Sequence, residues 1–245
     1  MSDISAQVSS AIDGLTSEYQ IIANNLANVS TTGYKRTTNT FSKMLNKLIS
    51  TDPTGTNQDD NPILTSKIDF SQGNLIESGR TLDVAISGKG FFVLQTDQGS
   101  TYTRSGNFDI NKNGQLVDQS GRVVAGKYGP ITIPPGAATS QITISTDGIV
   151  RVDGANVGEL KIVDFGKNES ELVPAGFGCY DAPADLKSED AKNVTIKQGY
   201  LEGSNVQMME ELVDMINVTR LYQANMKLLT TGSDNTKNLI NLAMG

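Results

Sequence analysis

The sequence contains no histidine, no tryptophan and one cysteine among its 245 residues. Without imidazole, Ser-His and Cys-His catalysis are unavailable, and zinc sites that need histidine are excluded. Cys179 has no second cysteine to pair with, which excludes an intrachain disulfide and a CxxC redox motif. Aromatic residues make up only 6% of the chain, which is few for an enzyme with a deep apolar pocket. These absences disfavour an enzyme, and we expect a protein that is not an enzyme and that holds no cofactor and no metal.

The chain is acidic and has no long apolar run. Its 20 basic and 27 acidic residues give a net charge of −7, which argues against nucleic acid or anionic membranes as partners held by bulk charge. No segment approaches the roughly 18–20 apolar residues that span a bilayer. The N-terminal segment also lacks the basic and apolar regions of a secretory signal. We therefore expect no nucleic-acid partner, no direct membrane insertion and no cleaved signal peptide.

Residues 3–30 carry apolar side chains at alternating steps of four and three residues. This spacing predicts a helix with a heptad seam, which is narrower than the apolar face of an ordinary surface helix. The seam consists of Val8, Ile12, Leu15, Tyr19, Ile22, Leu26 and Val29.

Residues 205–243 repeat the pattern at the other end of the chain. They contain no proline and one glycine, as expected for a second helix. Its seam consists of Met208, Leu212, Met215, Thr219, Tyr222, Met226 and Leu229.

A helix whose single apolar seam faces water is not stable by itself. Fixing about 28 backbones costs on the order of 30–50 kcal/mol, whereas burying seven apolar side chains returns about 10–20 kcal/mol. The seam therefore needs a partner, which is either the other terminal helix of the same chain or a helix of another chain. The small or polar residues Asn24, Asn25, Ala27 and Asn28, where a monomeric helix usually carries Lys and Glu, favour contacts with further copies. We therefore expect the apolar residues of both seams to form an assembly interface.

The region between the helices has short runs of Val, Ile, Phe and Tyr separated by turn signals such as Asn113-Gly114 and Asp147-Gly148. This alternation is typical of antiparallel strands joined by hairpins, and the expected strands include 131–133, 149–152 and 159–165. The sequence therefore predicts an α+β fold, in which long N- and C-terminal helices form a coiled-coil-like core beside a central antiparallel all-β domain. The expected domains are a helical core segment over 1–50, a linker over 51–70, an outer β domain over 71–190, and a C-terminal segment over 191–245 that completes the core.

Patterns that resemble catalytic or ligand sites have simpler explanations. Residues 109–120 begin like a calcium loop, but its twelfth position is Ser120 rather than glutamate, so a β-turn is expected. The glycines around Lys89 do not precede a helix and form no phosphate loop. Cys179 is expected to pack as a small apolar residue. The scattered carboxylates keep a glycan-cleaving hydrolase open as an alternative.

Six short segments follow one another along nearly the whole chain and together form a specific pattern. Near the N-terminus, residues 23–36 (ANNLANVSTTGYKR) contain Asn24, Asn25, Leu26, Ala27, Asn28, Gly33 and Tyr34. The other segments are 83–92 (DVAISGKGFF), 102–108 (YTRSGNF), 199–206 (GYLEGSNV), 211–216 (ELVDMI) and 220–225 (RLYQAN). In this order they resemble the signature of the bacterial flagellar rod and hook proteins.

That resemblance implies a structural subunit of the bacterial flagellar basal-body rod. Such a subunit self-assembles through its terminal helices into a hollow helical shaft, which transmits torque and passes exported subunits. The implied partners are further copies, other axial rod and hook proteins, and the flagellar type III export apparatus. The implied location is the periplasmic rod, reached without a cleaved signal peptide. Phe41 and Leu45 are similar to the Phe-x-x-x-hydrophobic element that the family uses at the export gate.

Length discriminates within the family, because hook proteins are typically much longer than this chain. The compact segment between Phe41 and Gln72, together with residues 129–136 (GPITIPPG), looks more like a proximal rod protein than a distal one. The remaining alternatives are a hook-like or other axial flagellar protein, and an extracellular β-rich adhesin or binding module with helical ends.

Overall fold

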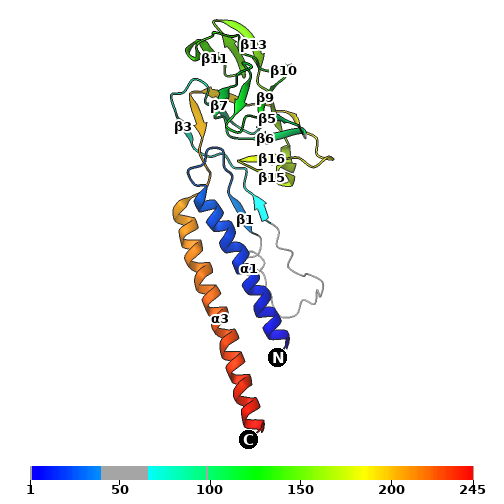
Figure 1. Ribbon diagram of the computed structural model, residues 1–245, viewed down its shortest axis with the longest axis vertical. Helices are drawn as coiled ribbons and strands as arrows, with labels where there is room; N and C mark the ends of the chain where they lie inside the picture. Colours follow the sequence, from blue (N-terminus) through cyan, green and yellow to red (C-terminus); the bar gives the residue numbers. More distant parts are fainter. Residues whose placement is uncertain (1, 40–65, 98, 245) are drawn as a thin grey trace. The chain divides into compact units, whose positions relative to one another are not determined.

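The structure is a computed structural model that describes residues 2–39, 66–97 and 99–244 (Figure 1). The chain divides into two compact units. The first, the helical unit, consists of Met1–Ala27, Thr37–Ile68 and Gln207–Gly245. The second, the β unit, consists of Asn28–Arg36 and Asp69–Val206.

The helical unit contains one helix from each end of the chain. Helix α1 (Ser2–Ala27) lies beside helix α3 (Met208–Met244) (Figure 1). Glu210 and Glu211 lie in the first turn of α3, where their negative charge interacts favourably with the positive end of the helix dipole. The short strands β1 (Thr37–Asn39) and β2 (Ser66–Ile68) pair antiparallel in the same unit. None of the described helices is both long enough and apolar enough to span a bilayer.

The β unit is built from short strands joined by tight turns. Its N-terminal half contains β3 (Leu75–Glu77), β4 (Val84–Ser87), β5 (Phe91–Thr96), β6 (Gly99–Thr103), β7 (Phe108–Ile110), β8 (Leu116–Asp118), β9 (Val123–Gly126) and β10 (Gly129–Pro130). Its C-terminal half contains β11 (Ile142–Ile144), β12 (Ile149–Val152), β13 (Ala155–Glu159), β14 (Ile162–Asp164), β15 (Val173–Gly176), β16 (Cys179–Asp181), β17 (Glu189–Asp190), β18 (Thr195–Gln198) and β19 (Tyr200–Glu202). Two 3-10 turns, η1 (Thr139–Gln141) and η2 (Gly166–Glu171), complete the unit.

The strands of the β unit pair antiparallel in four sheets. The largest has the order β15-β16-β6-β5-β9-β8-β7, with β10 on β9, β14 on β5 and β17 on β14. The others are β11-β12-β13, β18-β4 and β19-β3. In the last two sheets, strands from the C-terminal end of the β unit return to pair with the first strands of that unit, as Ile196 opposite Ile86 and Leu201 opposite Ile76 show.

The core of the β unit lies where these sheets pack together. Phe92 of β5 and Phe108 of β7 meet edge to face, with ring centroids 5.1 Å apart. Ile86, Leu116 and Val150 are also buried in this core, together with Cys179. The cysteine therefore packs as a small apolar side chain, and burial raises the pKa of its thiol.

Turn residues set the connections that the sequence indicates. In the segment after β7, the side-chain oxygen of Asn111 accepts hydrogen bonds from the backbone N–H groups of Asn113 and Gln115. Gly114 then adopts a positive φ of 77°, which a residue without Cβ reaches at low cost. The segment that begins like a calcium loop is thus a β-turn.

The predicted fold class, α+β with a coiled-coil-like core of long terminal helices, is wrong for this structure. Strands outnumber helices among the described elements, and each end of the chain supplies a single helix. Among the side chains that the structure describes, the buried apolar cluster between α1 and α3 consists of Leu15, Ile22 and Val218, with Met215 against it. The seam residues Tyr19 and Leu212 are exposed. The spacing in the sequence is that of a coiled coil, but the packed side of the helix pair follows the two seams only in part.

Candidate assembly surface

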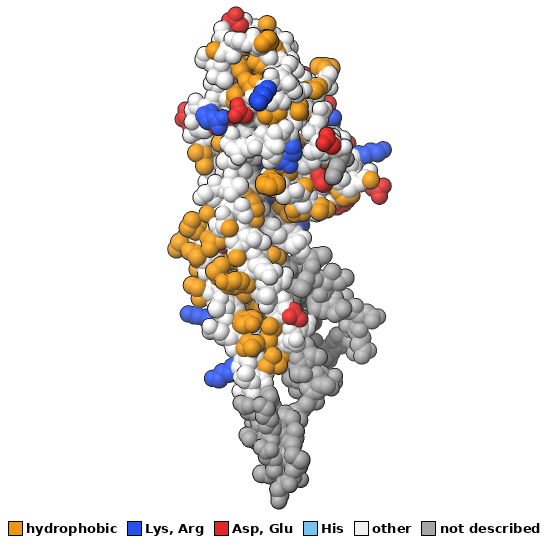
Figure 2. All heavy atoms as spheres, viewed as in Figure 1, with side chains coloured by type: hydrophobic (Ala, Val, Ile, Leu, Met, Phe, Trp, Pro, Cys, Tyr) orange, Lys and Arg blue, Asp and Glu red, His pale blue; other side chains and the backbone are white. Residues whose placement is uncertain are grey.

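Helix α3 carries a continuous stripe of exposed apolar side chains over its first quarter, residues 208–216. Because residues three and four positions apart lie on the same side of a helix, these side chains form one surface. We call it the α3 stripe, and its members are Met208, Met209, Leu212, Val213 and Ile216. Figure 2 shows hydrophobic side chains gathered along the helical part of the visible face. A contiguous exposed apolar surface of this kind usually marks an interaction site.

The opposite side of α3 is occupied by α1. Leu15 and Ile22 of α1 pack with Val218 and Met215 of α3. Further along the pair, Asn25 and Glu211 are both almost fully buried, and the Asn25 amide donates to a carboxylate oxygen of Glu211 over 3.2 Å. The contact between the helices is therefore part apolar and part polar, and it leaves the α3 stripe uncovered by α1.

Asn25 also holds β1 in place. Its side-chain oxygen accepts from the backbone N–H of Thr37 over 2.9 Å, and its amide donates to the backbone oxygen of Thr37 over 2.8 Å. Together these two bonds reproduce the pairing that a neighbouring strand would offer. This residue of the family signature therefore links the end of α1 to the first strand.

A pair of acidic residues is part of the same helix pair. Burial raises the pKa of the Glu18 carboxyl on α1, and the negative charge of Asp214 on α3 raises it further. The helix pair thus contains a carboxylate whose ionisation opposes close packing at neutral pH.

The β unit contains a buried network of three charged side chains. The Lys35 ammonium lies 2.6 Å from one carboxylate oxygen of Glu202, and the Arg104 guanidinium lies 3.4 Å from the other. All three side chains are at most 1% exposed. Lys35 also donates to the backbone oxygen of Ser71 over 2.6 Å, and Arg104 donates to that of Gly88 over 2.9 Å. The network therefore joins separate segments of the sequence.

Burial dominates the electrostatics of this network. It lowers the pKa of both Lys35 and Arg104, while the negative charge of Glu202 opposes the decrease. Glu202 receives a further hydrogen bond from the backbone N–H of Gly73 over 2.9 Å. One carboxylate thus stabilises two buried cations, which is why it accepts donors on both oxygens.

The sequence alone did not predict this network, although each of its members lies in one of the motifs: Lys35, Arg104 and Glu202. The one feature that could have indicated them is a charged residue among small residues inside each of these motifs. Spacing along the chain could not show that these charges meet, because 167 residues separate Lys35 from Glu202.

The expected assembly residues are spread over different environments. Leu15 and Ile22 are buried, whereas Tyr19, Met208, Leu212, Tyr222 and Met226 are exposed. The half-buried members are Val8, Ile12, Leu26, Val29, Met215 and Leu229. The structure thus places part of each seam in the helix pair and part of it at the surface.

The family-signature residues lie at and beyond the end of α1. Asn25 and Gly33 are buried, Asn24 and Ala27 are exposed, and Leu26, Asn28 and Tyr34 are half-buried. The backbone N–H of Gly33 donates to the backbone oxygen of Glu202 over 2.7 Å, which places Gly33 beside the ion network. The expected export-gate residues, Phe41 and Leu45, lie outside the described residues.

The described ranges contain no group of three or more acidic or cysteine side chains positioned to hold a metal ion. The exposed feature that suits contacts between proteins is the α3 stripe, whereas the charged network is buried inside the β unit and stabilises its fold.

Comparisons with known families match three parts of the chain. Residues 15–35 match the family described as "Flagella basal body rod protein". Residues 85–152 match "Flagellar hook protein FlgE/F/G D1 domain", and residues 197–242 match "Flagellar basal body rod FlgEFG protein C-terminal". All three descriptions are of flagellar axial proteins.

Curated relatives extend this similarity to nearly the full length. A flagellar basal-body rod protein FlgG of Agrobacterium fabrum is 35% identical, covering 94% of this chain and 95% of the relative. FlgF proteins of Salmonella typhimurium and Caulobacter vibrioides are 34% and 32% identical, covering 88% and 92% of this chain and 88% and 89% of the relatives. The chain belongs to the flagellar basal-body rod protein family.

Family membership confirms the expected function at this level. The chain is a structural subunit of the flagellar basal-body rod and not an enzyme, which sets aside the hydrolase and the adhesin. Its relatives include both FlgG and FlgF proteins at similar identity, so the choice between a proximal and a distal rod protein stays a prediction.

Proposed function

We propose that this rod subunit assembles with further copies and with other axial proteins through the α3 stripe. The observation that carries the proposal is the stripe itself, because α1 covers only the opposite side of α3. Each of the five side chains is about half exposed, so covering them contributes roughly half of the 1.5–3 kcal/mol that full burial gives per side chain, which is still a substantial driving force for association. In a monomer that surface would face water.

The shaft that results would be hollow and helical, would transmit torque and would pass exported subunits. We propose a periplasmic rod location, delivery by the flagellar type III export apparatus without signal cleavage, and a proximal position in the rod. The resemblance of the sequence motifs supports these finer points. Phe41 and Leu45 remain our candidates for contact with the export gate.

Ile216→Asp tests the proposal directly. Ile216 is 52% exposed in the α3 stripe, so the charge should not disturb the fold of the monomer but should be desolvated when copies associate. We expect unchanged helical circular dichroism, loss of swimming in cells that carry only this variant, and roughly tenfold or greater loss of sedimenting assemblies of the purified chain.

Asn217→Asp is the matched control, because it adds the same charge at the next exposed position of α3, where the native side chain is already polar. It should assemble and swim normally. Leu15→Asp serves as a second comparison: it places a charge between the helices and should destabilise the helix pair by about 3 kcal/mol or more. Normal assembly and swimming of Ile216→Asp would refute the proposal.

A further inference from the structure

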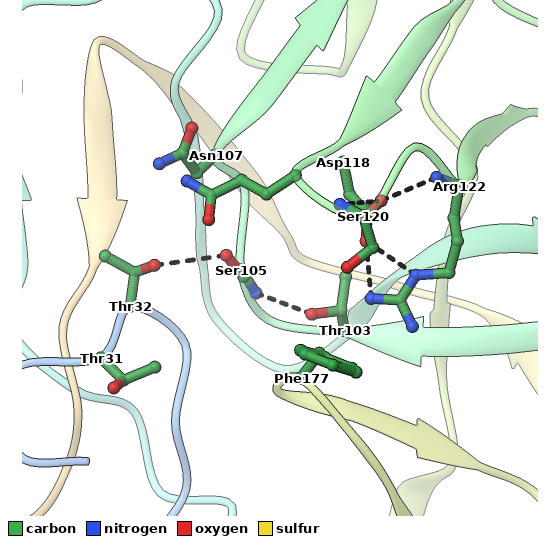
Figure 3. Close-up of a pocket in the computed structure, with 10 residues that line it drawn as sticks. Thr31, Thr32, Thr103, Ser105, Asn107, Asp118, Ser120, Arg122 and Phe177 are labelled. Atoms are coloured by element: carbon green, nitrogen blue, oxygen red, sulfur yellow. Dashed lines mark hydrogen bonds and ion pairs between the residues drawn. The ribbon is translucent and has the colours of Figure 1, made fainter. Parts of the chain in front are cut away.

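A small pocket in the β unit is lined by side chains from four separate segments (Figure 3). Thr31 and Thr32 close one side, and Asp118 and Arg122 of the β8–β9 turn close the other. Phe177, at the tip of the β15–β16 hairpin, completes the wall. Neither the expected site residues nor the ion network include these side chains.

Phe177 is held in an unusual conformation. Its φ is +51°, which is rare for a residue with a bulky side chain, and the residue is 88% exposed. Gly176 and Gly178 on either side also have positive φ. The tight turn of this hairpin thus holds an aromatic ring at the surface, beside the pocket.

The charged groups of the pocket are already paired. One carboxylate oxygen of Asp118, Oδ2, lies 2.8 Å from Nε and 2.6 Å from Nη2 of Arg122. Its other oxygen accepts from the backbone N–H groups of Ser120 and Arg122. The Asn107 oxygen accepts from Arg80, whereas for the amide groups of Asn107 and Gln119 no acceptor is found among the described residues. The pocket thus offers neutral donors and an aromatic ring but no unbalanced charge.

The size of the cavity limits which chemical group can occupy it. The cavity measures about 180 Å³, below the roughly 300–1,000 Å³ of sites that enclose a small molecule. It suits a single side chain. An aromatic ring with a hydroxyl group fits best, because the ring can meet Phe177 edge to face and the hydroxyl oxygen can accept from the two amides.

The chain carries such a side chain at the far end of β9. Tyr128 lies in the turn between β9 and β10, and it is 93% exposed. The pocket residues Asp118 and Arg122 lie before β9, so the strand of four residues separates pocket and tyrosine by about 13 Å. Tyr128 and the pocket of the same chain therefore lie at opposite ends of one strand.

We propose that Tyr128 of one copy inserts into the pocket beside Phe177 of a second copy. This inference rests on the proposed assembly of the subunit and names a second contact in it. A projection and a pocket at different places on one chain make a heterologous contact, which can continue from copy to copy into a helical array. The contact would link neighbouring β units independently of the α3 stripe.

The experiment replaces Tyr128 with the photo-cross-linker p-benzoylphenylalanine in the full chain. Assemblies are prepared from equal amounts of ordinary and ¹⁵N-labelled chain, irradiated, and digested for mass spectrometry. We expect mixed-isotope cross-links from position 128 to peptides that contain Phe177 or Gln119. The same cross-linker at Ile76, which is also exposed in the β unit, is the control and should not reach those peptides.

Substitutions give an independent measurement. Tyr128→Ala and Phe177→Ala should each raise the critical concentration for assembly about tenfold. Because both changes remove the same contact, the double variant should be no worse than either single one. Tyr128→Phe should cost about threefold through the lost hydrogen bond, and Val173→Ala on the same hairpin should cost nothing.

The outcomes separate the two proposals. Normal assembly with no cross-link from position 128 to the pocket, or with wild-type critical concentrations for the alanine variants, would overturn this inference and leave the α3 stripe standing. If the wild-type chain and Ile216→Asp behave alike and neither assembles, both proposals fall.

Discussion

Glu202 shows how single residues hold the β unit together. Moving a charge out of water costs several kcal/mol, which a buried ion pair recovers only with good geometry and satisfied hydrogen bonds. Glu202 meets that condition by accepting from Lys35, Arg104 and the Gly73 backbone. Four of the family motifs contribute a charged side chain or a backbone acceptor to this network. Such a network fixes which segments meet, even where it adds little net stability.

Gly33 occupies a position where the local geometry permits only glycine. Its φ is +70°, and a Cβ at this position would lie 2.4 Å from the backbone nitrogen of Ser105. We expect Gly33→Ala to destabilise the β unit by about 2–4 kcal/mol, because the unfavourable φ adds to a clash with backbone. Urea unfolding of the full chain measures the loss.

Gly79→Ala separates the effect of the positive φ from the effect of the steric clash. Gly79 has nearly the same φ, +71°, but nothing lies within 4 Å of its added Cβ. This variant should therefore lose only about 1 kcal/mol. Equal losses for the two variants would show that the close approach to Ser105 does not matter.

At the scale of elements, the contact between α1 and α3 is less apolar than the sequence pattern indicates. Asn25 and Glu211 occupy buried positions that a coiled coil would give to leucine or valine. Such polar pairs are used elsewhere to fix one register of two helices at some cost in stability. We interpret the short apolar cluster and the polar pair as a contact that selects one alignment of the helices.

The pH dependence of the helix pair follows from Glu18. Its pKa is raised above the ordinary value of 4.5 by burial and then by Asp214. The folded state therefore binds a proton more tightly than the unfolded state, and the resulting stabilisation is complete below about pH 4.5 and is lost as pH rises through the raised pKa. Glu18→Gln should raise the melting temperature of the helical signal at pH 7 and flatten its change between about pH 4.5 and 7.

Asp13→Asn is the matched control for this prediction, because Asp13 is exposed on the same helix. It should leave both the melting temperature and its pH dependence close to those of the wild type. A Glu18→Gln variant that melts at or below the wild-type temperature at pH 7 would contradict the assignment.

At the scale of the whole molecule, an extended α3 surface is left for other copies to cover. Beyond the α3 stripe, exposed apolar residues continue along the helix through Leu221, Met226 and Leu228. Helices that lack tertiary contacts open readily, because most helical stability in proteins comes from packing. The isolated subunit should therefore hold α3 less firmly than the assembled one.

Hydrogen exchange followed by mass spectrometry tests this expectation. Amides of α3 between Met208 and Leu229 should exchange at least about tenfold more slowly in assemblies than in the monomer, because assembly covers the exposed side of the helix. Amides of β5, whose strand is already paired on both sides, should change little and serve as the internal control. Equal protection of α3 in both states would argue against its use in assembly.

Much of the local structure could be predicted from the sequence. The strand expected over 149–152 coincides with β12, and the helix expected over 3–30 ends at Ala27. The strand expected over 159–165 is divided between β13 and β14, and that expected over 131–133 contributes only an isolated bridge from Thr132 to Gln115. Alternation and turn residues act within a few positions, so they locate elements well, whereas pairing with distant strands decides where each element begins and ends.

The sequence by itself determined the family, the lack of any histidine for catalysis and the two terminal helices, because composition, motifs and periodicity are properties of the residues and their close neighbours. Only the tertiary structure decided which sides of the helices are buried, how Lys35, Arg104 and Glu202 meet, and where the pocket beside Phe177 forms. These features depend on contacts between segments up to 186 residues apart, as between Asn25 and Glu211. The spacing of residues along the chain does not show which distant segments come into contact.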